Sequence, residues 1–293
     1  MSYRTVVIKN RAKIETRLNW LVIRGEEEKL VHLSEIGTLI VESTGCAITT
    51  QALCQLVKNN TSIIFCDEKH MPHSQLSPLY GNHLTSGNVK RQARWAEERK
   101  ALAWQEIVKQ KIYWQAQLLD RHNKSDSAKL LYDYICNVKE GDITNREGHS
   151  AKVYFNALFG QGFGRRTDNE INSALNYGYA ILLSSVAREI VGAGYITQIG
   201  IHHINEFNYY NLASDIMEVF RPIVDTYVLN ISDYENFKSK VTAVLTAKAE
   251  IFGKEQFLDA TVRIYVRAVL HFMEGEGEMP KLDKIHMFLP EES

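Results

Sequence analysis

The amino-acid sequence predicts an α+β protein in which a β-rich N-terminal domain precedes a larger all-α domain. Short β-branched runs occupy the N-terminal part, while stretches with helical spacing occupy the remainder. A segment rich in Pro, Gly, Ser, His and Asn, residues 72–88, separates the strand-like part from the helix-like part. We therefore expect a β-rich domain over 1–80, a linker over 81–88 and a helical domain over 89–293.

The N-terminal part contains short runs that are typical of strands, because β-branched and aromatic residues favour an extended backbone. The expected strands are Arg4–Lys9, Lys13–Asn19, Trp20–Arg24, Lys29–His32, Thr38–Glu42 and Ser62–Cys66. Gly25–Glu28 predicts a hairpin turn between the third and fourth of these strands. Apolar residues at helical spacing in Thr49–Asn59 predict one helix in this part.

Beyond residue 88 the apolar residues recur at the spacing of amphipathic helices. The first stretch, 89–121, is the longest, and Trp95, Trp104 and Trp114 are among its apolar positions. Further helices are expected at 126–137, 145–159, 168–192, 211–229, 233–251 and 256–273. The second part is therefore expected to be all-α.

Composition places the chain among ordinary globular proteins. Of its 293 residues, 45% are hydrophobic and 24% are charged. No apolar run approaches the roughly 18 residues of a membrane span, and the N-terminus is too polar for a signal peptide. The four cysteines form no C-x-x-C pair, which predicts reduced thiols. We therefore expect a cytoplasmic protein without a membrane segment.

Glu147 lies in the first motif that could carry chemistry. Thr144 and Glu147 have the spacing of a capping box, in which the Glu147 side chain returns to the N-cap amide. The functional alternative is a carboxylate held at a rigid helix start, with room for a ligand beside Gly148. Arg146 and Lys152 would then suit a neighbouring phosphate.

Two histidines and two acids form the other candidates. His202 and His203 follow a glycine-rich turn and are either ordinary loop residues or the source of one imidazole ligand. Asp215 and Glu218 are three residues apart, which places both carboxylates on one face of a helix beside apolar neighbours. They are either solvated acids or acids neutralised by a divalent cation.

Together, two or three carboxylates and one imidazole suit Mg²⁺ or Mn²⁺. Such an ion activates a water or a 3′-hydroxyl for phosphodiester chemistry. The sequence contains no Walker A, G-x-G-x-x-G, G-x-S-x-G or H-E-x-x-H motif, which argues against several other enzyme classes.

Basic residues gather locally even though the formal net charge is -1. The candidates for contact with DNA phosphates are Lys90, Arg91 and Arg94 in a basic stretch, and Arg165 and Arg166 in a glycine-rich loop. For the two loop arginines the alternative is surface pairing with Asp168 and Glu170.

Four motifs occur in order: E-G-H-S-A, then R-R-T-D-N-E-I-N-S-A-L-N-Y-G-Y-A, then G-I-H-H, then L-A-S-D-I-M-E-V-F-R-P. This order resembles the CRISPR-associated endonuclease that captures spacers, in the branch that accompanies a single large RNA-guided nuclease (type II systems). The resemblance implies metal ligation by Glu147, by one of the two histidines, for which we favour His203, and by Glu218. Glu218 stands where many relatives have Asp, and this leaves Asp215 as a second ligand or a support.

The resemblance also implies partners. The protein would be a homodimer joined through the β-rich domain, with the helical domain as the catalytic one. It would bind double-stranded DNA and a small ferredoxin-like adaptation subunit, with further contacts to the large RNA-guided nuclease and another adaptation protein. The implied reaction is strand transfer, in which the 3′-hydroxyl of a short fragment attacks a phosphodiester at the repeat boundary.

Two other functions compete with this interpretation. The same chemistry would serve a repair nuclease that cuts branched DNA and never joins it. A DNA-binding scaffold would use the acids only to support its fold. Joining of a free 3′-hydroxyl separates the first from the integrase, and metal binding by the acids separates the second from both.

Overall fold

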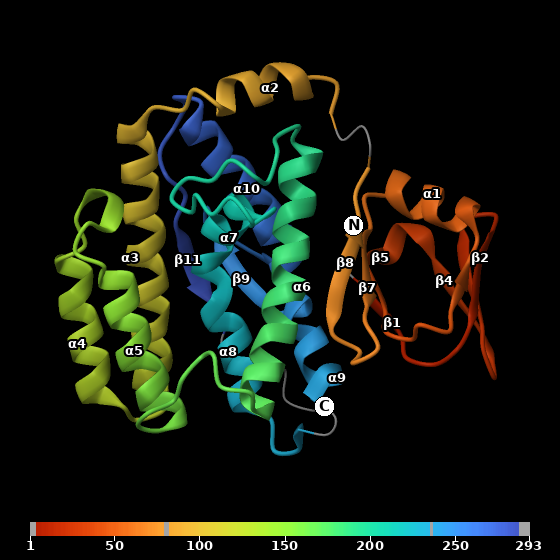
Figure 1. Ribbon diagram of the computed structural model, residues 1–293, viewed down its shortest axis with the longest axis horizontal. Helices are drawn as coiled ribbons and strands as arrows, with labels where there is room; N and C mark the ends of the chain where they lie inside the picture. Colours follow the sequence, from red (N-terminus) through yellow and green to blue (C-terminus); the bar gives the residue numbers. More distant parts are fainter. Residues whose placement is uncertain (1–3, 79–81, 235–236, 287–293) are drawn as a thin grey trace.

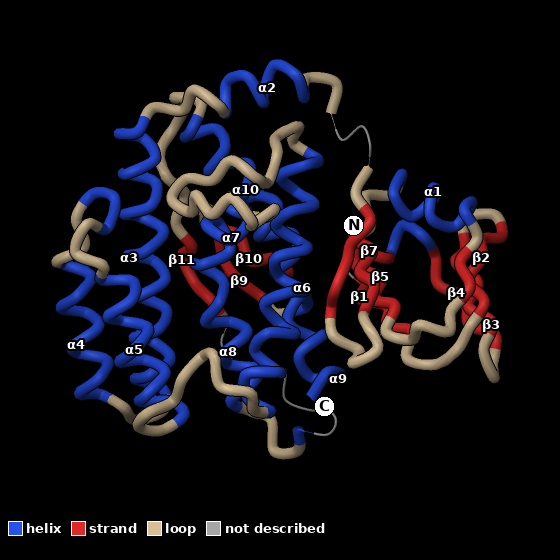
Figure 2. Tube along the Cα trace, in the orientation of Figure 1, coloured by secondary structure: helices blue, strands red, loops and turns tan. Residues whose placement is uncertain are grey.

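The computed structural model describes residues 4–78, 82–234 and 237–286. The chain forms a strand-rich N-terminal part followed by a helical part, and the two lie side by side (Figure 1). Figure 2 shows most strands gathered in the N-terminal part and a second, smaller group among the helices. The predicted α+β class is therefore confirmed.

Two four-stranded sheets and one helix build the N-terminal part. The first sheet has the order β1-β5-β7-β8, with β1, β5 and β7 parallel, and the second has the order β4-β3-β2-β6. The elements are β1 (Arg4–Ile8), β2 (Lys13–Arg17), β3 (Trp20–Arg24), β4 (Glu28–His32), β5 (Ile36–Val41), β6 (Ala47–Ile48), α1 (Thr50–Lys58), β7 (Ser62–Cys66) and β8 (Pro72–Leu76). The expected strands and the expected helix of this part are confirmed to within a few residues.

The helical part is built from α2 to α10. These helices are α2 (Thr85–Gln92), α3 (Glu97–Arg121), α4 (Ser125–Cys136), α5 (Arg146–Phe159), α6 (Glu170–Gly192), α7 (Asn211–Met217), α8 (Arg221–Leu229), α9 (Phe237–Thr242) and α10 (Leu258–Met273). Short 3-10 turns interrupt the chain at Glu140–Asp142, at Glu218–Phe220 and at Ala243–Thr246. Within the residues that the structure places, no helix has the length and apolarity needed to cross a membrane.

Three expectations about element type were wrong. The second part is not all-α, because β9 (Lys248–Ile251), β10 (Lys254–Phe257) and β11 (Leu282–Ile285) form a sheet in the order β10-β9-β11. The helix expected over 89–121 is broken near Trp95 into α2 and α3. The loop expected over 72–88 contains β8 and the start of α2. Residue 81 of the expected linker and residues 235–236 of an expected helix lie outside the described residues.

Helix α6 joins the two parts. Its Tyr177 hydroxyl donates a hydrogen bond of 2.7 Å to Glu42, and Ser184 and Ser62 share one of 2.6 Å between their hydroxyls. Further along, Arg188 donates to the carbonyl of Gly37 at 2.9 Å. The sheet β1-β5-β7-β8 therefore packs its outer face on α6. Burial of this polar seam fixes the sheet against the helices.

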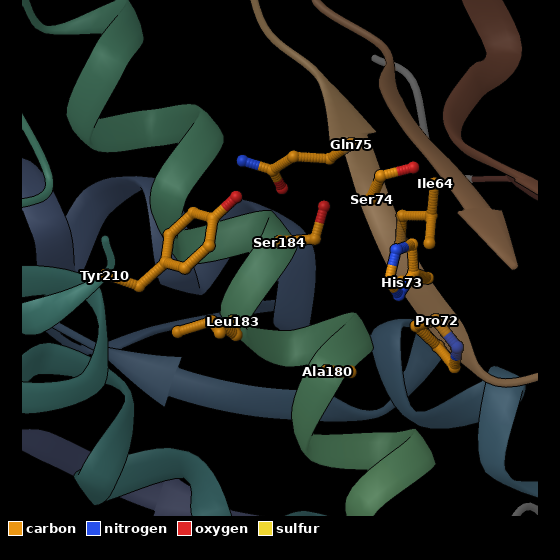
Figure 3. A pocket seen from close by; sticks show the side chains of 9 residues that line it. All are labelled: Ile64, Pro72, His73, Ser74, Gln75, Ala180, Leu183, Ser184 and Tyr210. Carbon is orange, nitrogen blue, oxygen red and sulfur yellow. The ribbon is translucent and has the colours of Figure 1, made fainter. Parts of the chain in front are cut away.

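A small pocket marks part of this seam (Figure 3). It lies between α6 and the β7–β8 pair, and it is lined by Ile64, Pro72, His73, Ser74, Gln75, Ala180, Leu183, Ser184 and Tyr210. None of these lining residues is an acid, so the pocket does not contain the carboxylates that the sequence singled out.

Candidate metal-binding active site

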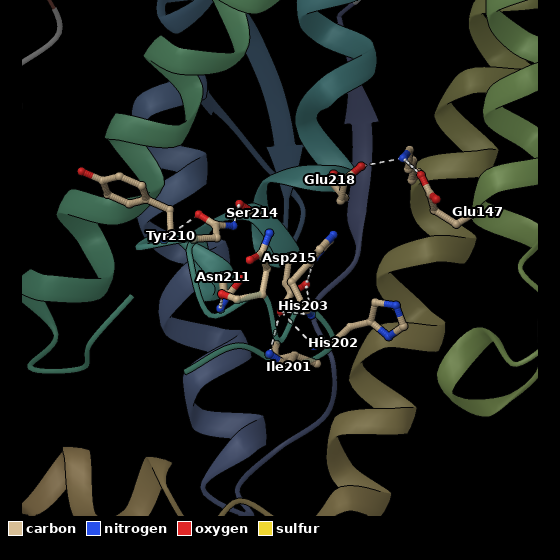
Figure 4. Close-up of polar contacts among 12 residues, drawn as sticks. Glu147, Ile201, His202, His203, Tyr210, Asn211, Ser214, Asp215 and Glu218 are labelled. Atoms are coloured by element: carbon tan, nitrogen blue, oxygen red, sulfur yellow. Dashed lines mark hydrogen bonds and ion pairs between the residues drawn. The ribbon is translucent and has the colours of Figure 1, made fainter. Parts of the chain in front are cut away.

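Glu147 and Glu218 come together at one cation, the ammonium group of Lys111. Glu147 lies in the first turn of α5, Glu218 directly follows α7, and Lys111 lies in the middle of α3. The Lys111 Nζ donates hydrogen bonds to Glu147 Oε1 and, at 2.5 Å, to Glu218 Oε2. Figure 4 shows the two acids facing each other, with the histidine pair beneath them. The fold thus gathers two of the predicted site residues from separate helices.

Burial strengthens the charge–charge interactions within this cluster. The side chains of Lys111 and Glu218 are 6% and 7% exposed, whereas that of Glu147 is 30% exposed. Burial by itself lowers the pKa of Lys111, but Glu218 and Glu147 outweigh it and raise that pKa above its usual value. Burial also raises the pKa of Glu218, but Arg221 and Lys111 outweigh it and lower that pKa. Both groups are therefore ionised at neutral pH.

The turn before α5 holds Glu147 differently from the predicted capping box. The Asp142 carboxylate accepts hydrogen bonds from the backbone amides of Arg146 and Glu147, at 2.8 and 2.9 Å. Asn145, in the left-handed region at φ 51°, caps the helix by accepting from the amide of Gly148. The Glu147 side chain is therefore not used for capping, because Asp142 and Asn145 satisfy the orphan amides.

Gly148 serves this cap rather than a ligand. A Cβ atom at position 148 would lie 2.7 Å from Oδ1 of Asn145, so a larger residue there would require the capping side chain to shift. The expected space for a ligand beside Gly148 is thus occupied by the protein itself. Thr144, the expected cap, has its buried hydroxyl without a hydrogen-bond partner.

Asp215 holds the histidine loop in place. Its side chain is fully buried and accepts hydrogen bonds from the backbone amides of Ile201, His202 and His203, at 2.6, 2.9 and 3.1 Å. It also accepts from Nδ1 of His203 at 2.5 Å. With its oxygens satisfied in this way, Asp215 is suited to support the loop rather than to bind a metal.

This arrangement prepares His203 as a nitrogen donor. The hydrogen bond to Asp215 raises the pKa of His203, although burial opposes the rise. Because Nδ1 is engaged by Asp215, Nε2 is the ring nitrogen that remains for a ligand. A histidine oriented by a carboxylate on its other nitrogen is the usual arrangement at protein metal sites.

Gly200 permits the close approach of this loop to α7. A Cβ atom at Gly200 would lie 2.5 Å from the carbonyl oxygen of His203 and 2.7 Å from Oδ2 of Asp215. A larger residue there would push the histidine loop away from the acid that holds it. The glycine of the G-I-H-H motif therefore has a steric role.

His202 has a different environment from its neighbour. Its ring stacks on Trp104 of α3, with ring centroids 4.2 Å apart and planes 1° from parallel. Burial lowers the pKa of His202, so the ring is neutral near pH 7. These contacts favour a positioning role for His202 and leave His203 as the candidate ligand.

The donor set fits a hard divalent cation. Glu147 and Glu218 already bind a shared positive charge, and His203 is oriented by Asp215 as a metal-binding histidine would be. Across 4–78, 82–234 and 237–286, however, no three His, Cys, Asp or Glu side chains stand close enough to hold an ion. In this arrangement the Lys111 ammonium takes the place between the two acids.

The sequence motifs did not point to Lys111, although its position in α3 indicates a buried charge. It follows Ile107 and Val108 and precedes Ile112 on the buried face of α3, where a lysine is exceptional. A lysine at helical spacing within an apolar stripe predicts a buried partner of opposite charge. Arg221, whose Nε lies 2.7 Å from Oε1 of Glu218, was also missed.

The predicted phosphate contacts divide into exposed and engaged side chains. Lys90, Arg94, Lys152 and Arg166 are exposed. Arg91 is exposed but pairs with Glu274 at 2.5 Å. Arg146 lies over the ring of Tyr134, 5.1 Å from its centroid. The exposed four remain the better candidates for DNA.

Arg165 does not pair with the acids that were the expected alternative. Its guanidinium donates hydrogen bonds to the side chains of Asn172 and Asn176. The same group lies over the rings of Phe155 and Tyr179, 5.6 and 5.3 Å from their centroids. Arg165 therefore anchors the glycine-rich loop to α6.

A second buried acid lies close to this site. Asp225 of α8 accepts hydrogen bonds from the hydroxyls of Tyr154, at 2.7 Å, and Tyr179. Burial raises the pKa of Asp225 to about 6, although both hydroxyls oppose the rise. Arg221 lies over the ring of Tyr179, 4.5 Å from its centroid, and so connects this acid to Glu218.

Solved structures with the same architecture define the class of fold. One is a casposase bound to integration product, which aligns at a TM-score of 0.74 with 20% identity, covering 100% of this chain and 95% of that one. Another is a CAS1 protein from Thermotoga maritima, at a TM-score of 0.71 with 17% identity, covering 94% and 99%. At these identities the similarity shows the fold alone.

Sequence comparison gives the family. The chain belongs to the family of CRISPR associated protein Cas1, whose family model matches residues 5–249. A CRISPR-associated endonuclease Cas1 from Neisseria meningitidis is 35% identical over 243 residues, covering 83% of this chain and 80% of that protein. A second endonuclease of this name, from Francisella tularensis subsp. novicida, is 25% identical over 267 residues, covering 84% and 83%.

Proposed function

We propose that this protein is a metal-dependent DNA endonuclease and integrase that inserts short DNA fragments into a CRISPR repeat array. The observation that carries the proposal is the convergence of Glu147 and Glu218 on one cation beside a histidine oriented by Asp215. Membership of the Cas1 family supports it, as does the naming of the Neisseria relative as an endonuclease.

In this proposal Glu147, Glu218 and His203 hold the metal ion. When bound, Mg²⁺ or Mn²⁺ activates a 3′-hydroxyl or a water and offsets charge on the attacked phosphodiester. Asp215 keeps the His203 ring in the orientation that presents Nε2. Arg221, whose Nε lies 2.7 Å from Oε1 of Glu218, would add a fixed positive charge that stabilises charge developing on a phosphate bound there.

The same family relation supports a proposal about DNA and protein partners. The casposase relative was solved with integration product, and another relative was solved as a Cas6-RT-Cas1--Cas2 complex. We infer that this chain acts as a homodimer through its β-rich part, together with a small ferredoxin-like subunit. Its exposed basic side chains, Lys90, Arg94, Lys152 and Arg166, would contact DNA phosphates and make binding salt-dependent.

A strand-transfer assay tests the proposed function. Purified protein, the small partner subunit, a short duplex and supercoiled repeat DNA are combined with Mg²⁺ or Mn²⁺. We expect joined product from the wild type and almost none from Glu147→Gln. Glu98→Gln, a change of an exposed acid in the first turn of α3, is the matched control and should match the wild type.

The other outcomes identify the competing functions. A protein that cuts branched DNA but never joins a 3′-hydroxyl would be a repair nuclease. DNA binding without cutting or joining, unchanged by Glu147→Gln, would indicate a scaffold.

A further inference from the structure

Lys111 is a buried lysine that touches both candidate metal ligands. Its Nζ contacts Glu147 Oε1 and Glu218 Oε2, and only 6% of its side chain is exposed. We propose that Lys111 is a positioning residue whose ammonium group keeps the two carboxylates together and competes with the divalent cation for them. This inference rests on the proposed function, because it assumes that the two acids bind a metal.

The charge balance of the cluster supports competition. Lys111 and Arg221 carry two positive charges against the two negative charges of Glu147 and Glu218. The cluster is therefore neutral without a metal ion. With a divalent cation added at the same place, Glu147 and Glu218 would no longer balance the positive charges that contact them, which is costly in a largely buried cluster unless one cation withdraws.

The contacts of Glu218 lead to the same conclusion. Its Oε2 accepts from Lys111 at 2.5 Å, and its Oε1 lies 2.7 Å from Nε of Arg221. Both oxygens thus face a cation. A metal ion bonded to Glu218 at about 2.0–2.6 Å must replace at least one of these contacts.

Of the two cations, Lys111 is the one placed to move. Arg221 is also held over the ring of Tyr179, whereas Lys111 Nζ donates hydrogen bonds to Glu147 and Glu218, the two acids that a metal ion would occupy. The lysine side chain is a flexible four-carbon stem, so its ammonium group can shift without moving α3. Displacement of Lys111 from the acids would therefore leave the backbone of the site in place.

Metal binding in Lys111→Met tests this competition. The matched control is Lys109→Met, two residues earlier on α3, where the lysine pairs with Glu106. The probe is Mn²⁺, titrated by calorimetry into the full-length protein, and thermal unfolding in EDTA is the second readout. We expect Lys111→Met to bind Mn²⁺ about tenfold more tightly than the wild type, because no internal cation opposes the metal.

Lys111→Met should also change the temperature of thermal unfolding. In EDTA, Lys111→Met should unfold at least about 6 °C below the wild type, because the buried acids lose their counter-charge. Mn²⁺ should recover most of this difference, and Lys109→Met should match the wild type in both readouts. If Lys111→Met is recovered folded only when purified with Mn²⁺, the proposal is supported, and failure to fold even with Mn²⁺ contradicts it.

Two further comparisons separate the alternatives. Lys111→Arg keeps the charge, so it should retain wild-type affinity for Mn²⁺, and affinity as high as that of Lys111→Met would contradict competition. Unchanged or weaker Mn²⁺ binding by Lys111→Met, with wild-type binding still lost in Glu147→Gln, would overturn the role of Lys111 alone. A wild-type protein that binds no Mn²⁺ would overturn the metal site, and with it the proposed function.

Discussion

Two buried acidic clusters lie near each other in the helical part, and they differ in the groups that donate hydrogen bonds to the acids. In the first, Glu147 and Glu218 share the ammonium group of Lys111. In the second, Asp225 accepts hydrogen bonds from two tyrosine hydroxyls. Cations stabilise ionised carboxylates by charge, whereas hydroxyls stabilise them only by hydrogen bonding.

This difference supports the proposal that the metal ion binds at the first cluster and not at the second. Nearby cations lower the pKa of Glu218 despite its burial, while burial raises the pKa of Asp225 to about 6. An acid that stays ionised can exchange an internal cation for a metal ion. Asp225, fully buried and bonded to the hydroxyls of Tyr154 and Tyr179, supports the packing of α5, α6 and α8 instead.

The largest expected effect contrasts one acid from each cluster. Glu218→Gln removes a candidate ligand and should lower cutting and strand transfer by about a thousandfold. Asp225→Asn should lower the same rates by less than about tenfold, because Asp225 acts through packing. Gel assays of both variants under identical metal concentrations make the comparison. Equal losses in the two variants would remove the distinction between the clusters.

The stability of the protein should depend on pH through Asp225. The pKa of Asp225 is about 6 in the folded protein against 3.8 ordinarily, so the folded state binds this proton more tightly than the unfolded state. The resulting stability is fully present below pH 3.8 and is lost as pH rises through about 6. The total is about 3 kcal/mol.

Urea unfolding of the wild type and Asp225→Asn between pH 5 and 7 measures this contribution. As the pH rises, the wild type should lose free energy of unfolding relative to the variant. A difference between the two that stays constant over this range would contradict the raised pKa of Asp225.

A third acid, Asp215, provides a smaller effect. Asp215→Asn keeps the shape of the side chain but weakens its hold on Nδ1 of His203. We expect a loss of activity of roughly ten- to a hundredfold, the usual cost of removing a carboxylate that orients a metal-binding histidine. Titration with Mn²⁺ should show weaker binding as well. Activity equal to the wild type would show that His203 needs no such support.

The smallest expected effect concerns two adjacent arginines. Arg166 is exposed, whereas Arg165 is held by Asn172 and by the ring of Tyr179 in the second cluster. Arg166→Ala should weaken DNA binding and reduce its salt dependence by about one phosphate contact. Arg165→Ala should chiefly lower thermal stability. Fluorescence anisotropy at several salt concentrations distinguishes them, and the reverse pattern would contradict this assignment.

Much of the fold could be predicted because periodicity is strong where elements are long or uniformly β-rich. Helix α6 and strands β3 and β7 closely follow the expected ranges. Strands β9 and β10 were not predicted, because each has four residues and mixes charged with apolar side chains. Their conformation is set by pairing with each other and with β11, which is a tertiary effect.

The site was harder to predict, because its contacts join distant segments. The motifs pointed to Glu147 and Glu218, but local spacing could not show that Lys111, 36 and 107 residues away from them, lies between the two. The capping box failed for a related reason, since Asp142 and Asn145 adopt left-handed backbone that the Thr144–Glu147 spacing did not reveal. Charge partners and caps are decided by the packed fold.

Whether Glu147, Glu218 and His203 hold a metal ion can be seen in a crystal structure grown with Mn²⁺, with anomalous diffraction recorded for manganese. We expect a manganese peak within about 2.0–2.6 Å of carboxylate oxygens of Glu147 and Glu218 and of Nε2 of His203. Lys111 should have withdrawn from at least one acid. A crystal soaked in Mn²⁺ that shows no peak between these residues, with Lys111 still bridging Glu147 and Glu218, would contradict it.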